Sequence, residues 1–207
     1  MPRSEKANMV VREEARERIL RAARTVFATR GPAATMGEVA EKAGVSQGLA
    51  YRYFQSKEEI LATLVKQAAE SGGGLPARMD RIRGSPGEKL HALVSGILDA
   101  RRREPEFYQL IYQVLSDHKT PNQLREVILK AGTMMGAEMR KLIVEGQASG
   151  EFADDDPDQL LGALTACLDG LSRAMLVLEP GKASASIPDA KVVMRIFRPD
   201  SREESAR

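Results

Sequence analysis

The residues of this sequence that are best suited to contact a polyanion lie close together, in the segment SQGLAYRYFQSK. Gln47 carries a donor and an acceptor on one amide, the arrangement that pairs bidentately with adenine. The hydroxyls of Tyr51 and Tyr53 can reach phosphate oxygens without burying a charge. The alternative is that the aromatic residues form a small core. We expect this of Phe54, which has no polar group, and expect the tyrosines to make contacts.

Lys57 adds a positive charge to the same segment. It directly follows Ser56, which has the capping-box spacing to Glu59 and can therefore start a helix. An ammonium group beside the free N–H groups of a helix start favours phosphate binding. Residues 1–57 hold eleven Lys or Arg and six Asp or Glu, so the positive charge of the chain lies at this end. The charge distribution agrees with a polyanionic partner.

Other kinds of chemistry find little support in the sequence. Cys167 is the only cysteine, which excludes an internal disulfide and a Cys-based zinc site. His91 and His118 are too far apart in sequence to form a spaced metal-binding pair. A single cysteine suits a reducing cytoplasm, and the N-terminus lacks the apolar segment of a signal peptide. We therefore expect a cytoplasmic protein with no metal, no cofactor and no catalytic residue.

The elements that must position these residues are predicted to be helices. Three segments share a capping residue, a proline and a Glu or Gln at the third helical position; they are Ser85–Glu88, Thr120–Gln123 and Asp156–Gln159. Capping boxes at Thr35 and Ser56 predict two more helix starts. Apolar residues between these starts recur at helical spacing, and strand signals are almost absent. The chain is therefore predicted to be all-α, with about nine helices.

The predicted helices differ widely in length. The first is expected over about residues 10–29 and the longest from Leu124 to near Gly150, with a last short one over about 188–197. The run Gly72–Gly74 is interpreted as a flexible or kinked end of the fourth helix. Residues 201–207 are interpreted as a disordered tail.

Two of the predicted helices are short and closely joined. Met36–Ala43 has room for about two turns, Gly44 can end it in a left-handed conformation, and a second helix begins just after Ser46. Two helices joined by three residues fit a helix-turn-helix. Small apolar residues, Val39, Ala40, Val45 and Ala50, can lie between the helices. This leaves Ser46, Gln47, Gly48, Leu49, Tyr51 and Arg52 outside, where Leu49 could touch a thymine methyl.

Residues 12–61 resemble the DNA-binding domain of transcriptional regulators of the TetR family (TetR/AcrR type). The matching positions are Phe27, Gly31, Thr35, Val39, Ala40, Ala43, Gly44, Val45, Ser46, Gly48, Tyr51, Tyr53, Phe54, Lys57, Glu58 and Leu61. Two positions depart from the family pattern: Ala50 replaces the usual Leu, and Gly37 offers no side chain for a base contact. The resemblance and the surface argument together predict DNA contacts by Thr35, Ser46, Gln47, Gly48, Leu49, Tyr51, Arg52, Tyr53 and Lys57.

The resemblance implies a larger C-terminal domain that binds a small effector and pairs with a second subunit. It is carried more weakly there, by VEGQASGEFADDDPDQLLGALTACLDGL. The most apolar segment, residues 160–178, is interrupted by Asp169 and Arg173, so a buried or interface helix is favoured over a membrane span. Its predicted dimer residues are Leu161, Leu164, Leu168, Leu171 and Met175. The alternative is an ordinary core helix within one subunit.

The effector pocket is expected among the central helices. The predicted lining residues are His91, Phe107, Tyr108, Tyr112, Met134, Met135 and Met139, with His118 and Gln113 as further polar groups. For each of them, plain core or plain surface is the alternative. Arg101–Arg103 could attract an anion, but on a helix they point in different directions, and we expect them to be solvated.

The predicted organisation is a DNA-binding domain over residues 1–56, an effector-binding and dimerisation domain over 57–200, and the tail. The predicted function is a homodimeric repressor that binds a palindromic operator in double-stranded DNA, is released by a small molecule, and needs no membrane. One alternative is an all-α enzyme with an appended helix-turn-helix, although Cys167 has no histidine near it in sequence. Another is an activator or architectural protein with the same head, since repression and activation differ only in where the operator lies relative to a promoter.

Overall fold

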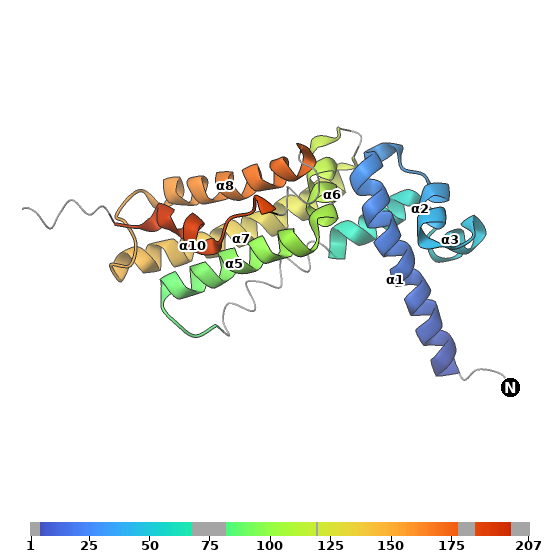
Figure 1. The fold of residues 1–207 in the computed structure, drawn as a ribbon, viewed down its shortest axis with the longest axis horizontal. Helices are drawn as coiled ribbons and strands as arrows, with labels where there is room; N and C mark the ends of the chain where they lie inside the picture. The colour runs from blue at the N-terminus through green and yellow to red at the C-terminus, as the bar shows by residue number, and fades with distance from the viewer. Residues whose placement is uncertain (1–4, 68–81, 119, 178–184, 200–207) are drawn as a thin grey trace, which may run out of the picture. The chain divides into compact units, whose positions relative to one another are not determined.

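The computed structural model describes residues 5–67, 82–118, 120–177 and 185–199. Within these ranges the chain forms nine α-helical segments, two short 3-10 helices and no strand (Figure 1). The predicted all-α class is confirmed. The predictions for Gly72–Gly74 and for the tail over 201–207 concern residues outside the described ranges.

The chain divides into two compact units. The first comprises Met1–Ala68 with Leu110–Ile128, and the second comprises Ala69–Gln109 with Leu129–Arg207. This division differs from the predicted boundary after residue 56. The reason is packing, because Ile60 and Leu64 of the helix over residues 57–67 are fully buried in the core of the first unit.

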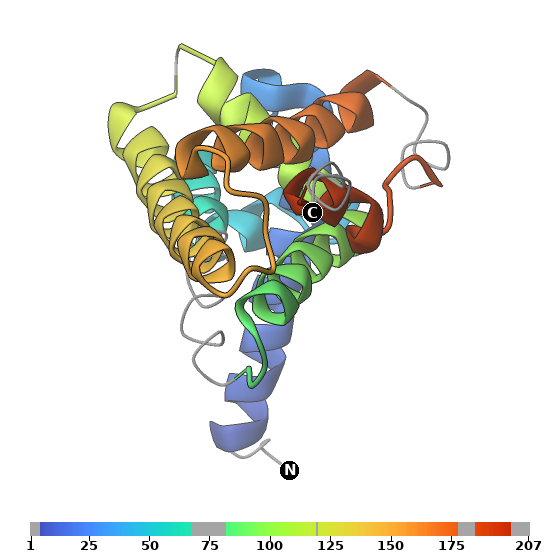
Figure 2. The same cartoon turned by 90° about the vertical axis from the view of Figure 1, so that its left-hand side faces the viewer.

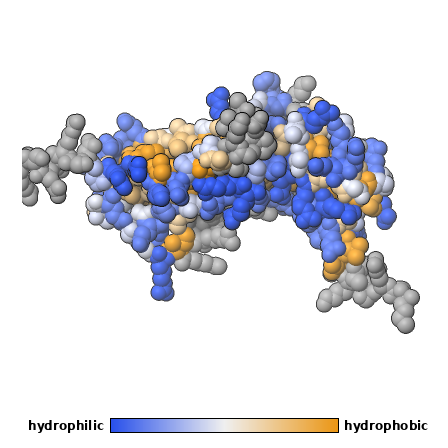
Figure 3. All heavy atoms as spheres, in the orientation of Figure 1, coloured by the Kyte–Doolittle hydropathy of each residue, from blue (hydrophilic) through white to orange (hydrophobic). Residues whose placement is uncertain are grey.

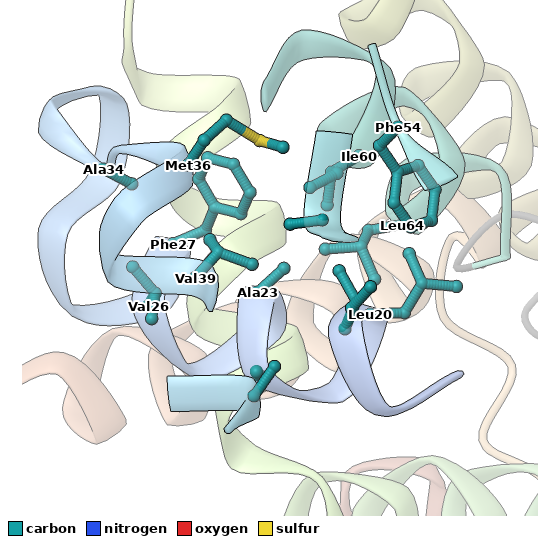
Figure 4. Close-up of a cluster of buried hydrophobic side chains, with 14 of the residues drawn as sticks. Leu20, Ala23, Val26, Phe27, Ala34, Met36, Val39, Phe54, Ile60 and Leu64 are labelled. Atoms are coloured by element: carbon teal, nitrogen blue, oxygen red, sulfur yellow. The ribbon is translucent and has the colours of Figure 1, made fainter. Parts of the chain in front are cut away.

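The first unit is built around α1. Its elements are α1 (Glu5–Arg30), η1 (Gly31–Ala33), α2 (Met36–Ala43), α3 (Gln47–Tyr53), the helix over 57–67, and the adjoining parts of α6 (Pro105–Ser116) and α7 (Asn122–Ala148). Figure 4 shows Phe27, Val39, Phe54, Ile60 and Leu64 gathered around Ala23 of α1. Burying these large apolar side chains holds the short helices in place, since helices of seven or eight residues are not stable alone.

The predicted helix starts are mostly confirmed. At α2, the Thr35 hydroxyl accepts from the Glu38 N–H at 3.2 Å, and the Glu38 carboxylate accepts from the Thr35 N–H at 2.9 Å. A second capping box joins Ser85 to Glu88 at the start of α5 (Pro86–Arg103). Asp156 caps α8 (Pro157–Val177) by accepting two backbone N–H groups at 2.9 and 3.0 Å. The start at Thr120 is shifted, because α7 begins at Asn122.

The second unit is a layered arrangement of longer helices. In Figures 1 and 2, α10 (Ala190–Val193) lies between α5 and α8, and it continues into η2 (Met194–Phe197). The largest fully buried side chains come from every layer; they are Leu90, Leu93, Leu98, Ile143, Leu164 and Phe197. The rings of Phe152 and Phe197 close one end of this core, with their centroids 5.0 Å apart.

Candidate nucleic-acid interface

The turn between α2 and α3 is formed by one glycine and two backbone hydrogen bonds. Gly44 adopts φ 63° and ψ 39°, a left-handed conformation that residues with a Cβ rarely take. Its N–H donates to the Glu41 carbonyl at 3.0 Å, and the Val45 N–H donates to the Ala40 carbonyl at 3.0 Å. These bonds satisfy carbonyls at the end of α2 and set the direction in which α3 leaves. The predicted helix-turn-helix is present.

One face of α3 packs inward, and the other carries the predicted contact residues. Ala50 is fully buried in the core of the first unit. The Ser46 hydroxyl accepts from the Leu49 N–H at 3.1 Å and so caps the helix. The exposed residues of this segment are Ser46, Gln47, Gly48, Tyr51 and Arg52, while Leu49 and Tyr53 are half-buried. The predicted contact residues that belong to α3 therefore lie on its exposed side, with Leu49 and Tyr53 at the edge.

The three aromatic residues of this segment have different surroundings. Phe54 is only 2% exposed, which confirms its prediction as a core residue. The guanidinium carbon of Arg16 lies 5.2 Å from the centre of its ring. Tyr53 packs against the same core, whereas Tyr51 is 48% exposed. Tyr51 is thus the aromatic side chain with the freest access to a partner.

Gly37 of α2 lies beside the Gln47 side chain. A Cβ placed at Gly37 would be 4.0 Å from Gln47 Nε2, which is ordinary van der Waals contact. Because glycine has no side chain, α2 contributes no group next to the Gln47 amide at this position. Gln47 is therefore well placed to approach a base edge.

An ion pair joins the end of α1 to the start of α2. Arg30 donates to Glu38 Oε1 from Nε at 3.0 Å and from NH2 at 2.8 Å. The Thr35 hydroxyl also bonds to Glu38, at 2.9 Å from Oε2. The bonds from Arg30 and then from Thr35 lower the pKa of the Glu38 carboxyl group. Thr35 is exposed, but its hydroxyl already serves this cap, and Arg30 offsets a negative charge that would repel phosphate.

Lys57 is oriented differently from its prediction as an outward phosphate clamp. Its Nζ donates to the Ala34 carbonyl at 3.1 Å, and the residue is half-buried. The helix start itself is as predicted, since the Ser56 hydroxyl accepts from the Glu59 N–H at 3.2 Å. Lys57 therefore ties the helix over 57–67 to the segment that precedes α2. Sequence spacing placed the residue on a helix start but could not show which way its side chain turns.

Lys57 also borders a cavity of about 230 Å³ within the first unit. Its lining is mainly apolar and comes from several helices: Phe27, Gly31, Lys57, Glu58, Leu61, Leu110, Gln113, Val114, Asp117, Thr120 and Pro121. Gln113 donates from Nε2 to the Ala28 carbonyl at 2.6 Å and so fastens α6 to the end of α1. This residue was predicted as a polar group of the effector pocket, and the structure instead places it in the first unit.

The predicted effector residues of α6 and α5 do not form one group. The rings of Phe107 and Tyr108 meet edge to face, with centroids 5.5 Å apart and planes at 88°. Tyr112, one turn further along α6, belongs to the first unit. His91 is exposed and lines a surface depression with Phe152. Phe107 and Tyr108 are therefore the aromatic candidates of the second unit.

Two of the three predicted methionines of α7 face the core, and the third faces outward. Met139 is 2% exposed and belongs to the core of the second unit, and Met135 packs against that core. Met134 is 52% exposed, so it is a surface residue in the single chain. The spacing of neighbouring residues on a helix explains this result, because Met134 and Met135 lie about 100° apart.

The predicted dimer residues of α8 are divided between the core and its edge. Leu164 and Leu168 are 0% and 5% exposed in the core of their own subunit, which corrects their assignment to an interface. Leu161 and Leu171 are half-buried against the same core. The side chain of Met175 is outside the described part of the chain. The more exposed face of α8 instead carries Gly162, Ala163, Ala166 and Gly170.

Arg101 differs most from its prediction as a solvated residue. It is 7% exposed and lies in the second unit, whereas its neighbour Arg103 is exposed. A signal was present in the sequence, because Arg101 follows Ile97 and Leu98 by one helical turn and so shares their apolar face. The three arginines are adjacent in sequence, but the helical period buries Arg101 and leaves Arg103 exposed.

The described residues form neither a metal-binding cluster nor a membrane-spanning helix. No three His, Cys, Asp or Glu side chains among them are placed to hold a metal ion. Every helix in the described ranges is too short or too polar to cross a lipid bilayer. Hydrophilic residues predominate over the face drawn in Figure 3.

Comparison with known proteins agrees with this geometry. Residues 19–64 match the model of bacterial regulatory proteins of the tetR family, and residues 86–187 match that of the C-terminal domain of BetI-type transcriptional repressors. Among solved structures, the TetR-family regulator PfmR from Thermus thermophilus is similar, with a TM-score of 0.72 and 21% identity over 90% of this chain and 97% of PfmR. At that identity the likeness supports the fold alone.

Curated relatives are also regulators. The transcriptional repressor NicS of Pseudomonas putida is 30% identical over 69% of this chain and 68% of its own. The transcriptional activator FasR of Mycolicibacterium smegmatis is 33% identical over 58% of this chain, and the match spans 54% of FasR. These relatives are regulators and not enzymes, so they do not support the enzyme alternative. With family models that match residues 19–64 and 86–187, and with the helix-turn-helix in place, the chain belongs to the TetR family of bacterial regulatory proteins.

Proposed function

We propose that this chain is a cytoplasmic, homodimeric repressor that binds a palindromic operator and is released by a small-molecule effector. The observation that carries the proposal is the exposed polar face of α3, whose direction is set by the turn at Gly44. A helix face of this size fits the major groove, which is about 12 Å wide. Two such helices in a two-fold dimer would lie about 34 Å apart, and an effector that changes their separation would weaken binding.

The residues of α3 would divide the work of recognition. Gln47 would read a base through its amide, and Gly48 would let the backbone come close to the DNA. Tyr51 and Arg52, both exposed, would contact phosphates. Lys57 would act in two ways, adding positive charge near the backbone and holding the Ala34 carbonyl.

The dimer contact is proposed on the exposed face of α8. Small residues there allow a second helix to approach closely, and the leucines behind them keep the helix rigid. Ala166→Glu would place a charge at the centre of this contact and should yield a monomer. Light scattering measures the molar mass of the purified variant in solution. Gly132→Glu, at an exposed position of α7, is the matched control.

The decisive experiment is the selection of genomic DNA fragments by the purified protein at two salt concentrations, followed by sequencing. An inverted repeat whose recovery falls steeply with salt is expected, since phosphate contacts release counterions. Recovery without sequence preference would refute the operator-binding function while leaving the fold untouched.

Two substitutions then separate base reading from phosphate binding. Gln47→Ala should relax the preference at one or two operator positions, whereas the exposed Gln123→Ala should not. Lys57→Gln should weaken binding to all sequences and lower the salt slope by about 1, compared with Lys66→Gln at the far end of the same helix. If Gln47→Ala leaves every position equally selective, the base-reading role is wrong.

An activator is the second candidate, because the matched relative FasR is named as one. A reporter driven by the selected operator decides between the two. Higher reporter output in a strain that lacks the protein indicates a repressor, and lower output indicates an activator.

A further inference from the structure

Arg101 is a buried cation whose hydrogen-bonding capacity is only partly used. Its Nε donates to the Ser172 hydroxyl at 3.1 Å, and its guanidinium carbon lies 4.7 Å from the centre of the Tyr108 ring. The NH1 group is buried and has no hydrogen-bond partner. Arg101 therefore holds a defined orientation while one of its donor groups is left unsatisfied.

Among the residues that the structure describes, no carboxylate forms an ion pair with Arg101. Burial has the largest influence on the Arg101 guanidinium and lowers its pKa, whereas Tyr108 and then Asp169 raise it. Asp169 is exposed and forms no ion pair with Arg101. An arginine nevertheless stays protonated at neutral pH, because its ordinary pKa is so high. A buried and unpaired cation is costly, so its retention calls for a function.

Apolar residues lie one helical turn before Arg101 and one turn before its partner Ser172. On α5 it follows Ile97 and Leu98 by one turn, and on α8 Ser172 follows Leu168 by one turn. These three aliphatic residues belong to one core cluster and are at most 8% exposed. In such a region a hydrogen bond between two ions is strengthened, because little water competes for either group.

We propose that Arg101 anchors a binding site for an organic anion, namely a carboxylate that carries an apolar body. The carboxylate would accept from the free NH1 group, while Ser172 and the Tyr108 ring keep the guanidinium in place. The apolar body would lie against the side chains that surround it. This inference rests on the proposed function, since it names the chemical class of the effector of the second unit.

The test uses the full chain and measures thermal unfolding with five carboxylates, each paired with its primary amide. The probes are hexanoate, octanoate, decanoate, dodecanoate and benzoate. At least one carboxylate should raise the Tm by roughly 5 °C when saturating, and its amide should not. Arg101→Gln should lower the affinity of the protein for that carboxylate about 10- to 100-fold. Arg103→Gln removes the same charge from an exposed site and should leave binding unchanged.

Two results would overturn the proposal. One is a Tm shift that is equal for each carboxylate and its amide, or absent for all of them. The other is a carboxylate shift that persists unchanged in Arg101→Gln. Should that variant not fold, Arg101→Met and Arg101→Lys take its place, because both keep the length of the stem. Arg101→Lys should regain part of the affinity, since it restores the charge but not the planar fork.

Operator binding by the same preparations separates this inference from the proposed function. If a carboxylate raises the Tm but the protein shows no operator preference, the anion site is supported and the regulatory function is refuted. If the amides release the operator as well as the carboxylates do, or if the carboxylates release it equally well from Arg101→Gln, the regulatory function is supported and the anion site is refuted.

Discussion

The two units of this protein place their charges in opposite ways. In the first unit, Arg30 pairs with Glu38 at the surface, and Lys57 reaches a backbone carbonyl. In the second, Arg101 is buried beside Ser172 and Tyr108 with one donor group unused. A surface that must read DNA gains from side chains held in one arrangement. A unit that must respond to a ligand gains from a hydrogen-bond donor that only the ligand satisfies.

The strongest way to break this comparison is to remove the support of the reading surface. Phe54→Ala should lower the free energy of unfolding by about 3–5 kcal/mol, because the ring is fully packed in the first unit. Urea unfolding followed by circular dichroism measures the loss. Tyr51→Ala, on the exposed side of α3, should change stability by no more than about 0.5 kcal/mol but weaken operator binding. Equal losses from the two substitutions would contradict the assigned faces.

Replacing either of two glycines by alanine should change the free energy of unfolding in opposite directions. In α7, Gly146→Ala would drive a methyl group into the buried Phe152 ring and should cost about 1–3 kcal/mol. In α3, Gly48→Ala meets nothing within 4 Å and should stabilise the helix by roughly 0.5–1 kcal/mol. Gly48→Ala should nevertheless bind the operator less tightly, because the methyl group lies on the exposed face. A stabilised Gly146→Ala protein would show that the packing around Phe152 is wrong.

Each unit has a capping box whose hydroxyl can be removed by one substitution. Thr35→Ala and Ser85→Ala should each cost about 1 kcal/mol, since each hydroxyl satisfies a backbone N–H at a helix start. The cost at Ser85 should be the larger, because its hydroxyl donates at 2.6 Å to Glu151, 66 residues away, whereas the Thr35 hydroxyl donates at 2.9 Å to Glu38 within its own cap. Thermal unfolding of both variants against Thr133→Ala, an exposed mid-helix control, decides the order. A neutral Ser85→Ala would exclude the capping role.

The smallest expected effect is a dependence on acid. Hydrogen bonds lower the pKa of Glu38, chiefly from Arg30, and that of Glu151, chiefly from Ser85. A depressed carboxyl pKa stabilises the fold above the unfolded-state pKa, and this contribution is lost as the pH falls through the folded-state pKa. Stability should therefore decline below about pH 5. Glu38→Gln and Glu151→Gln should each flatten that decline, and an unchanged pH profile would contradict the effect.

Local chemistry explains what could be predicted from the sequence. The caps at Thr35, Ser85 and Asp156 depend on residues within one turn of each other, and so does the left-handed end at Gly44. The inward and outward faces of α3 follow from the helical period and the few large apolar residues near it. Each of these features depends on close sequence neighbours, so a single chain is enough to read it.

The features that escaped prediction depend on contacts between distant residues. Lys57 turns toward Ala34, and Gln113 reaches Ala28, 85 residues away. Leu164 is as apolar as an interface residue would be, and only the packing of α8 against its own core shows that it is buried. A pattern along one helix gives the face on which a residue lies but not what covers that face.

The bond from Gln113 to Ala28 bears on how this protein can be divided for engineering. The DNA-reading unit is discontinuous in sequence, because residues 110–128 complete a core begun by residues before 68. A hybrid regulator cut after residue 68 would lack Leu110 and Val114 and would leave apolar side chains of α1 facing solvent. Exchanging DNA specificity between relatives therefore calls for grafting the surface of α3 alone, or for moving both segments together.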